Sequence, residues 1–194
     1  MASLVPPPRS SPESGDRAQW YARALDWATA GTSPVRLLTG LRFDVLELPA
    51  EAGHATLRRI GRTGPVAMAG RRMRLLVAAG SSEELPGLLD WLEWGGIDLD
   101  LSALGAGGHI TAPAPPGWAT GSPGAASWLR PPGPRQETEQ SLPAFGGLGS
   151  RGGDAPDLVR LVDAAATECH RATLARARAG LRTHRPTGQP LAFS

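Results

Sequence analysis

The chain has 194 residues and a formal net charge of +2, and 41% of its residues are hydrophobic, which is enough for one globular domain of ordinary size. Its one cysteine, Cys169, excludes an internal disulfide and a cysteine-rich zinc site. No apolar stretch reaches about 18 residues and the N-terminus has no apolar signal segment, so we expect a cytoplasmic protein with no membrane partner.

All 20 basic residues are arginines, and the chain contains neither lysine nor asparagine. Arginine, alanine, glycine and proline have GC-rich codons, so this composition is typical of a high-GC bacterium. An arginine count raised by codon usage is weaker support for nucleic-acid binding than the same count in a neutral background. The sequence pI of 9.4 permits an anionic partner without requiring one.

The first elements follow from capping and alternation signals. Asp16 and Gln19 have capping-box spacing, which predicts that a helix begins at Asp16. The alternation in LRFDVLEL, which shifts parity at Leu46, predicts a strand at 41–48 with one buried face that passes into full burial or a bulge. A short strand at 35–38 precedes it, and a short helix at 49–61 follows it.

Turn residues divide the middle of the chain into further elements. Gly70 and Arg71 predict the turn of a hairpin between VAMA and RMRLLVAA. A helix is expected from Ser81 to Gly95. Strands are expected at 97–101, 109–113 and 127–132. The predicted core residues of the helix are Leu88, Leu89, Trp91 and Leu92, and the predicted packing tryptophans are Trp91, Trp94, Trp118 and Trp128.

The last third of the chain predicts a linker and a helix. Residues 133–153 are rich in Gly, Pro, Gln and Ser without a sustained period, which predicts a mobile linker. Residues 154–182 carry an apolar stripe from Leu158 to Ala172 at helical spacing and predict an amphipathic helix that docks on the domain or on a partner. Residues 1–15 and 183–194 are expected to be tails. The predicted fold class is α+β, with a mainly antiparallel sheet and packed helices at 16–132 followed by the C-terminal helix.

Three segments in the middle of the chain carry a resemblance to a known family. They are TGLRFDVLELPAEAG (39–53), GPVAMAGRRMRLLV (64–77) and GIDLDLSALGAGGHITAPAPPG (96–117), with SWLRPP (127–132) beyond the third. In this order and spacing they resemble the N-terminal domain of bacterial bifunctional DNA primase/polymerases, of the archaeo-eukaryotic primase superfamily. The chain is similar to a shortened branch of that family found in high-GC actinobacteria.

The resemblance implies a primase-polymerase-like core in which carboxylates hold two divalent metals for nucleotidyl transfer. The paired acidic positions of the family's first strand correspond to Glu47 and Pro49, and its phosphate-orienting histidine corresponds to Met73. The third acidic position falls on Asp100, or on Asp98 if the loop is aligned differently. Glu47, Asp98 and Asp100 are therefore the candidate catalytic residues, with Mg²⁺ or Mn²⁺ needed only if the enzyme is active. Because a proline cannot bind a metal, we expect a degenerate site without a resident metal.

A cluster of arginines forms the second candidate site. Arginine makes bidentate contacts with phosphate, which favours a nucleic-acid surface, and a solvated face produced by codon usage is the alternative. Aromatic residues are not interleaved with these arginines, which argues against single-strand binding there. The candidate nucleic-acid-binding residues are Arg58, Arg59, Arg62, Arg71, Arg72 and Arg74.

Three functional hypotheses follow from the sequence. The first is a catalytically degenerate primase/polymerase-like module that binds DNA, RNA or a protein. The second is an active nucleotidyltransferase that uses the three carboxylates with a metal. The third is a regulatory factor that meets another protein through its C-terminal helix. A continuous arginine surface would favour the first, a convergent carboxylate trio the second, and an exposed apolar patch the third.

Overall fold

The computed structural model describes residues 12–119, 124–146 and 157–183, and within these ranges the chain forms five helices and two antiparallel sheets. The predicted α+β class is confirmed. None of the helices in the described ranges combines the length and the apolar character needed to cross a membrane. The helices are α1 (Pro12–Leu25), α2 (Ala50–Ile60), α3 (Ser81–Trp91), α4 (Arg135–Ser141) and α5 (Leu158–Thr183).

The larger sheet has five strands in the order β6–β3–β5–β4–β8, and the smaller sheet has three in the order β1–β2–β7. The hairpin predicted at Gly70 and Arg71 is present, and it places β5 in the centre of the larger sheet. The strands of the larger sheet are β3 (Asp44–Pro49), β4 (Val66–Ala69), β5 (Arg72–Val77), β6 (Ser102–Leu104) and β8 (Ser127–Arg130), and those of the smaller sheet are β1 (Thr29–Ala30), β2 (Arg36–Leu38) and β7 (His109–Thr111).

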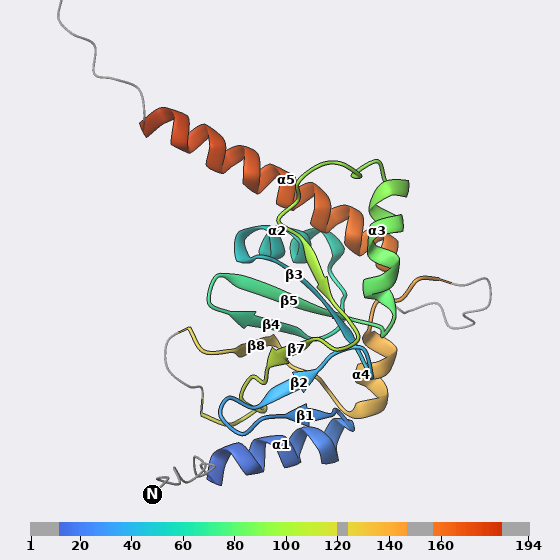
Figure 1. Ribbon diagram of the computed structural model, residues 1–194, viewed down its shortest axis with the longest axis vertical. Helices are drawn as coiled ribbons and strands as arrows, with labels where there is room; N and C mark the ends of the chain where they lie inside the picture. The colour runs from blue at the N-terminus through green and yellow to red at the C-terminus, as the bar shows by residue number, and fades with distance from the viewer. Residues whose placement is uncertain (1–11, 120–123, 147–156, 184–194) are drawn as a thin grey trace, which may run out of the picture.

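The two faces of the larger sheet support two separate cores (Figure 1). Side chains alternate along a strand, so Leu46 and Leu48 of β3 point to one face and Val45 points to the other. The first face packs under α2, α3 and α5. The second face packs against the smaller sheet and α1, around Tyr21 and Trp27. Both faces of β3 are therefore used, which explains why its apolar pattern loses strict alternation.

Helix α5 docks on the domain, as its apolar stripe predicts. Leu158, Leu161, Val162 and Cys169 are at most 1% exposed and belong to the same core as Leu46. Burying one Leu or Val side chain contributes roughly 1.5–3 kcal/mol, whereas an isolated helix in water is marginal. The apolar stripe is therefore buried against the domain, and only the opposite face of α5 is left for a partner.

The close approach of α2 to the sheet depends on a glycine. A Cβ atom at Gly53 would lie 2.3 Å from Sδ and 2.8 Å from Cβ of Met73. Met73 is fully buried on β5 beneath α2, on the face opposite to its neighbours Arg72 and Arg74. The side chain at the family's histidine position therefore belongs to the core.

The predicted linker at 133–153 is wrong over its first part. Residues 135–141 form α4, and Leu142 is buried in the second core. The backbone N–H of Ala78 donates to the carbonyl of Pro143 at 2.9 Å, which ties the segment after α4 to the end of β5. The proline- and glycine-rich composition of 133–153 predicts no helix. Helix α4 forms because tertiary contacts, which composition does not report, stabilise it. Residues 147–153 lie outside the described residues.

Two further expectations are corrected. The predicted strand at 97–101 is a loop, in which the N–H of Leu101 donates to the carbonyl of Leu99 at 2.6 Å and closes a tight turn around Asp100. Its alternation arises because Leu99 and Leu101 pack on the first core while the aspartates do not. Trp91, predicted as a core residue, is 71% exposed, since Leu85 and Leu88 already define the buried side of α3.

Candidate functional site

Strand register brings one acidic and two basic candidate residues onto the same face of the larger sheet. Glu47 on β3 pairs directly with Arg74 on β5, and Pro49 pairs with Arg72. Because residues two apart share a face, Glu47, Arg72 and Arg74 all project to one side. On this face Glu47 comes after Val45 on β3, and Arg72 and Arg74 come before Leu76 on β5. Val45 and Leu76 are buried in the second core, so the charged group lies at the border of that core.

The three side chains form a tight set of ion pairs. Arg74 Nε donates to Glu47 Oε2 at 2.7 Å, and Arg72 Nε donates to Glu47 Oε1 at 3.2 Å. Arg72 Nη2 also donates to the backbone carbonyl of Glu47 at 3.3 Å. The carboxylate of Glu47 therefore accepts one charged hydrogen bond on each oxygen.

Asp100 joins this set from the loop before β6. Arg72 Nη1 donates to Asp100 Oδ1 at 2.6 Å, so a single guanidinium links the two acidic candidates. Arg176 of α5 approaches Asp100 Oδ2 at 3.6 Å and Glu51 Oε1 at 3.4 Å. Glu47, Arg72, Arg74, Asp100 and Arg176 together are called the arginine-bridged cluster below.

Partial burial makes this cluster stronger than an ordinary surface network. The side chains of Arg74, Glu47 and Arg72 are 17%, 20% and 29% exposed. Partial burial alone would lower the pKa of Arg72, but the hydrogen bonds and Coulombic attraction from Asp100 and Glu47 outweigh it and raise that pKa. Among the described residues, Arg74 Nη1 is buried without a hydrogen-bond partner. The hydrogen bonds to Glu47 and Asp100 therefore hold the guanidinium groups of Arg72 and Arg74 in place.

The cluster does not fit a divalent metal. The guanidinium groups of Arg72 and Arg74 already donate to both oxygens of Glu47 and to Oδ1 of Asp100, and their positive charge would repel a divalent cation at this place. The second family position is Pro49, which has no ligand atom, and Met73 faces the other side of the sheet. Within the described part of the chain, no group of three His, Cys, Asp or Glu side chains is placed to hold a metal.

The other acidic residues of this region lie elsewhere. Asp98 is exposed in the loop between α3 and β6 and enters none of the ion pairs found among the described residues. Asp44 is fully buried, and its Oδ2 accepts from the backbone N–H of Ser82 at 2.9 Å in the first turn of α3. Asp44 is thus a helix cap supplied by a neighbouring strand. Asp44 and Glu47 lie on opposite faces, as their spacing predicts.

The six candidate arginines separate into two groups. Arg72 and Arg74 belong to the arginine-bridged cluster, and Arg71 is exposed at the hairpin turn beside them. Arg58 and Arg59 are exposed at the C-terminal end of α2, and Arg62 is exposed in the loop that follows. The structure therefore does not form one surface from the six residues.

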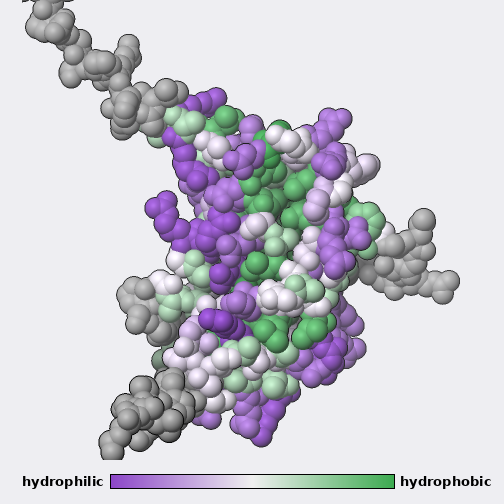
Figure 2. All heavy atoms as spheres, in the orientation of Figure 1, coloured by the Kyte–Doolittle hydropathy of each residue, from purple (hydrophilic) through white to green (hydrophobic). Residues whose placement is uncertain are grey.

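Helix α5 adds further arginines next to those of α2. Glu168 Oε1 accepts from Arg59 at 3.1 Å and from Arg171 at 2.9 Å, while Arg176 reaches Glu51 near the start of α2. The two helices are therefore antiparallel neighbours. Figure 2 shows hydrophilic residues gathered over the adjoining parts of α5, α2 and the β4–β5 hairpin. Five exposed arginines of this pair are called the α2–α5 basic surface, and they are Arg58, Arg59, Arg171, Arg176 and Arg178; Arg160, also exposed, lies nearer the start of α5 and is not included.

Comparison with known proteins identifies no relative. Family models, curated proteins and solved structures each give no match. The resemblance to primase/polymerases rests on the three sequence segments alone.

The sequence analysis missed the arginines of α5. Arg171 and Arg178 are seven residues apart and so lie on one side of the helix, opposite to the buried stripe. Counting charges on the polar face of the amphipathic pattern would have found them. The placement of Arg171 near Arg59 could not be found in this way, because it depends on how α5 packs on α2.

Proposed function

We propose that this chain is a primase/polymerase-like module that does not catalyse nucleotidyl transfer and that binds nucleic acid through the α2–α5 basic surface. The observation that carries the first half is the Arg72 guanidinium, which sits between Glu47 and Asp100. In a two-metal enzyme that place belongs to cations that activate the nucleophile and stabilise the leaving group. A guanidinium neutralises the carboxylates but offers no coordination site to a substrate oxygen.

The charge of the α2–α5 basic surface supports the second half. It holds five exposed arginines, and the acidic residues that pair with them are Glu51, Asp100 and the buried Glu168. Each of those acids is already shared with an arginine, so the surface keeps a net positive charge. Arginine pairs with phosphate in bidentate geometry, and a nucleic-acid backbone offers repeated phosphates to such side chains.

Nucleic-acid binding is tested by fluorescence anisotropy with labelled single-stranded DNA, duplex DNA and RNA of equal length. Arg58→Glu and Arg178→Glu each reverse an exposed charge, and neither side chain enters an ion pair within the described ranges. Each change should flatten the slope of log affinity against log salt by about one unit. Arg36→Glu on β2 is the matched control, because it is exposed on the smaller sheet. Arg72 is unsuitable here, since its reversal would break the arginine-bridged cluster.

Two results would contradict this assignment. If wild-type protein binds none of the three nucleic acids at low salt, a regulatory protein–protein role replaces it. If Arg36→Glu weakens binding as much as Arg58→Glu, the binding surface lies elsewhere.

The absence of catalysis is tested by primer extension and de novo primer synthesis with Mg²⁺ and with Mn²⁺. We expect no incorporation above the level of Glu47→Ala and Asp100→Ala. Losing one transition-state electrostatic partner costs about 10²- to 10³-fold, and here Pro49 and Met73 replace two of them. Robust incorporation by the wild type that both alanine variants abolish would establish the active nucleotidyltransferase instead.

A further inference from the structure

A hollow of about 420 Å³ opens on the outer side of α1. In Figure 1 α1 lies at the opposite end of the layered fold from α5, so this hollow is separate from the α2–α5 basic surface. Its volume falls within the range of small-molecule sites. The residues that line it, called the α1 hollow below, are Asp16, Gln19, Trp20, Arg23, Ala24 and Trp118.

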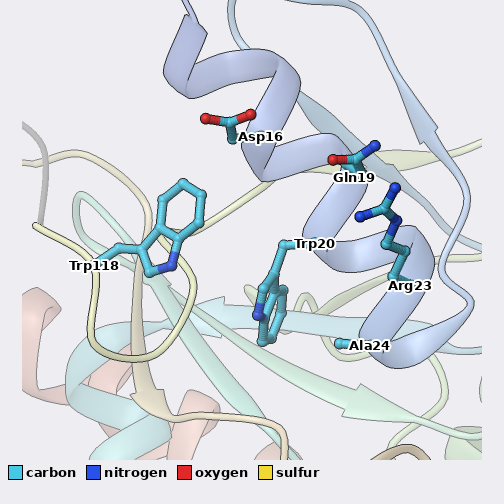
Figure 3. Close-up of a pocket in the computed structure, with 6 residues that line it drawn as sticks. All are labelled: Asp16, Gln19, Trp20, Arg23, Ala24 and Trp118. Atoms are coloured by element: carbon cyan, nitrogen blue, oxygen red, sulfur yellow. The ribbon is translucent and has the colours of Figure 1, made fainter.

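Two indole rings border the α1 hollow (Figure 3). Trp118 is 37% exposed, although the sequence predicts a packing residue, and Trp20 is partly buried. The two tryptophans are far apart in sequence, and only the tertiary fold brings them to one opening. An exposed indole presents a flat apolar face that water solvates poorly, and such a face is available for stacking.

The Trp20 indole is held by packing and hydrogen bonds around Tyr21. Trp20 packs edge-on against Tyr21 with ring centroids 4.9 Å apart, and the Tyr21 hydroxyl donates to the carbonyl of Pro113 and accepts from Trp128 Nε1, both at 3.0 Å. Arg17 Nη1 adds a hydrogen bond to the carbonyl of Ala112 at 3.3 Å. These bonds fasten the backbone at Ala112 and Pro113, in the segment that leads to Trp118, onto α1.

Three polar side chains of α1 also line the hollow. Gln19 offers an amide with both donors and an acceptor, Arg23 offers a guanidinium, and Asp16 offers a carboxylate. All three side chains are exposed, and Arg23 enters none of the ion pairs formed within the described ranges. The set combines stacking faces, an edge that can pair with ring nitrogens and exocyclic groups, and one cation for a phosphate.

We propose that the α1 hollow binds the base and phosphate of a nucleotide, with the ring stacked on Trp118, its edge against Gln19 and its phosphate near Arg23. This site goes beyond the proposed function and does not depend on it, because it uses a different face and base stacking in place of backbone charge. The same chemistry is offered by a free nucleotide and by one residue of a single strand.

Two other ligand classes fit the lining less well. A quaternary ammonium also favours aromatic faces, but Arg23 would repel it and only Asp16 would offset that charge. A proline-rich peptide uses aromatic grooves too, but it has no use for a cation at this place. A nucleotide engages the rings, the amide and the guanidinium together.

The test uses the full chain with AMP, CMP, adenosine and a ten-nucleotide oligo-dT as probes, followed by NMR shifts of the indole N–H signals. We expect saturable binding of AMP and CMP, with shifts at Trp20 and Trp118. Trp118→Ala should weaken AMP binding by roughly 5- to 150-fold, the range for losing one base–aromatic stack. Trp118→Phe should retain most of the affinity, because a stacking ring remains. Arg23→Gln should weaken AMP but not adenosine.

Trp91→Ala is the matched control, because Trp91 is 71% exposed on α3 and away from the hollow. Binding of oligo-dT that Trp118→Ala weakens would assign the site to single strands, and binding of mononucleotides alone would assign it to free nucleotides. Failure of the wild type to bind any of the four probes, or AMP binding unaffected by Trp118→Ala, would overturn the proposal. Arg58→Glu should leave AMP binding unchanged, so a failure of the α2–α5 assignment is read separately.

Discussion

Replacement of Arg72 by methionine should destabilise the protein without creating a cavity. Methionine keeps most of the length and volume of the arginine stem while removing the charge and every donor. The lost contacts are the hydrogen bonds to Glu47 Oε1, to the Glu47 carbonyl and to Asp100 Oδ1. Glu47 keeps Arg74 and Asp100 keeps Arg176, so neither carboxylate is left wholly without a cation.

The magnitude follows from how far water reaches these groups. A buried charged hydrogen bond contributes about 1.5–3 kcal/mol, and an exposed ion pair contributes about 0.2–1 kcal/mol. Arg72 and Glu47 are 29% and 20% exposed, nearer the buried limit, whereas Asp100 is 42% exposed and is screened. Combining one bond of each kind gives a loss of about 2–4 kcal/mol in the free energy of unfolding for Arg72→Met.

Urea unfolding followed by circular dichroism measures this loss. Arg71→Met is the matched control, because Arg71 is its exposed neighbour at the hairpin turn and should change stability by no more than about 0.5 kcal/mol. A double-mutant cycle with Asp100→Asn isolates the Arg72–Asp100 pair. Equal effects of Arg72→Met and Arg71→Met, together with a cycle coupling near zero, would refute the bridging role of Arg72.

Three further outcomes follow from the packing. Leu161→Ala should lower the free energy of unfolding by about 2–5 kcal/mol, because Leu161 is fully buried on the inner side of α5. Leu174→Ala on the same helix should lower it by less than about 0.5 kcal/mol, because Leu174 is 42% exposed, and equal losses in urea unfolding would show that α5 is not docked. Burial, aided by the nearby Asp100, raises the pKa of the Cys169 thiol to about 12, so it stays protonated at pH 8 and should react with a disulfide reagent only after unfolding; rapid labelling of native protein would contradict this. Trypsin should cleave the native protein slowly at Arg135, because this residue begins α4 and pairs with Glu139. Mass spectrometry identifies the first fragments, and early cleavage at Arg135 would contradict an ordered α4.

Local patterns in the sequence were sufficient for much of the fold. The hairpin at Gly70, the buried stripe of α5 and the antiparallel α+β class follow from alternation, turn residues and helical spacing, which act over a few residues. The choice of Glu47, Asp98 and Asp100 as candidate catalytic residues also came from sequence, through the resemblance to primase/polymerases, and of these the structure brings only Glu47 and Asp100 into one cluster. Local signals failed at α4, whose proline- and glycine-rich surroundings predict a linker while its contacts with the domain order it.

The sequence by itself determined which side chains this protein possesses for a site: a glutamate, a proline that cannot bind metal, and a surplus of arginine. Only the tertiary structure decided what those side chains do. Cross-strand register set Arg74 opposite Glu47, and a tight loop turn carried Asp100 to Arg72. The packing of α5 on α2 brought Arg59 and Arg171 to the same acceptor, Glu168. The attachment of α1 placed Trp20 at the same hollow as Trp118. These contacts join residues distant in sequence, so their geometry depends on the whole core and no local pattern encodes it.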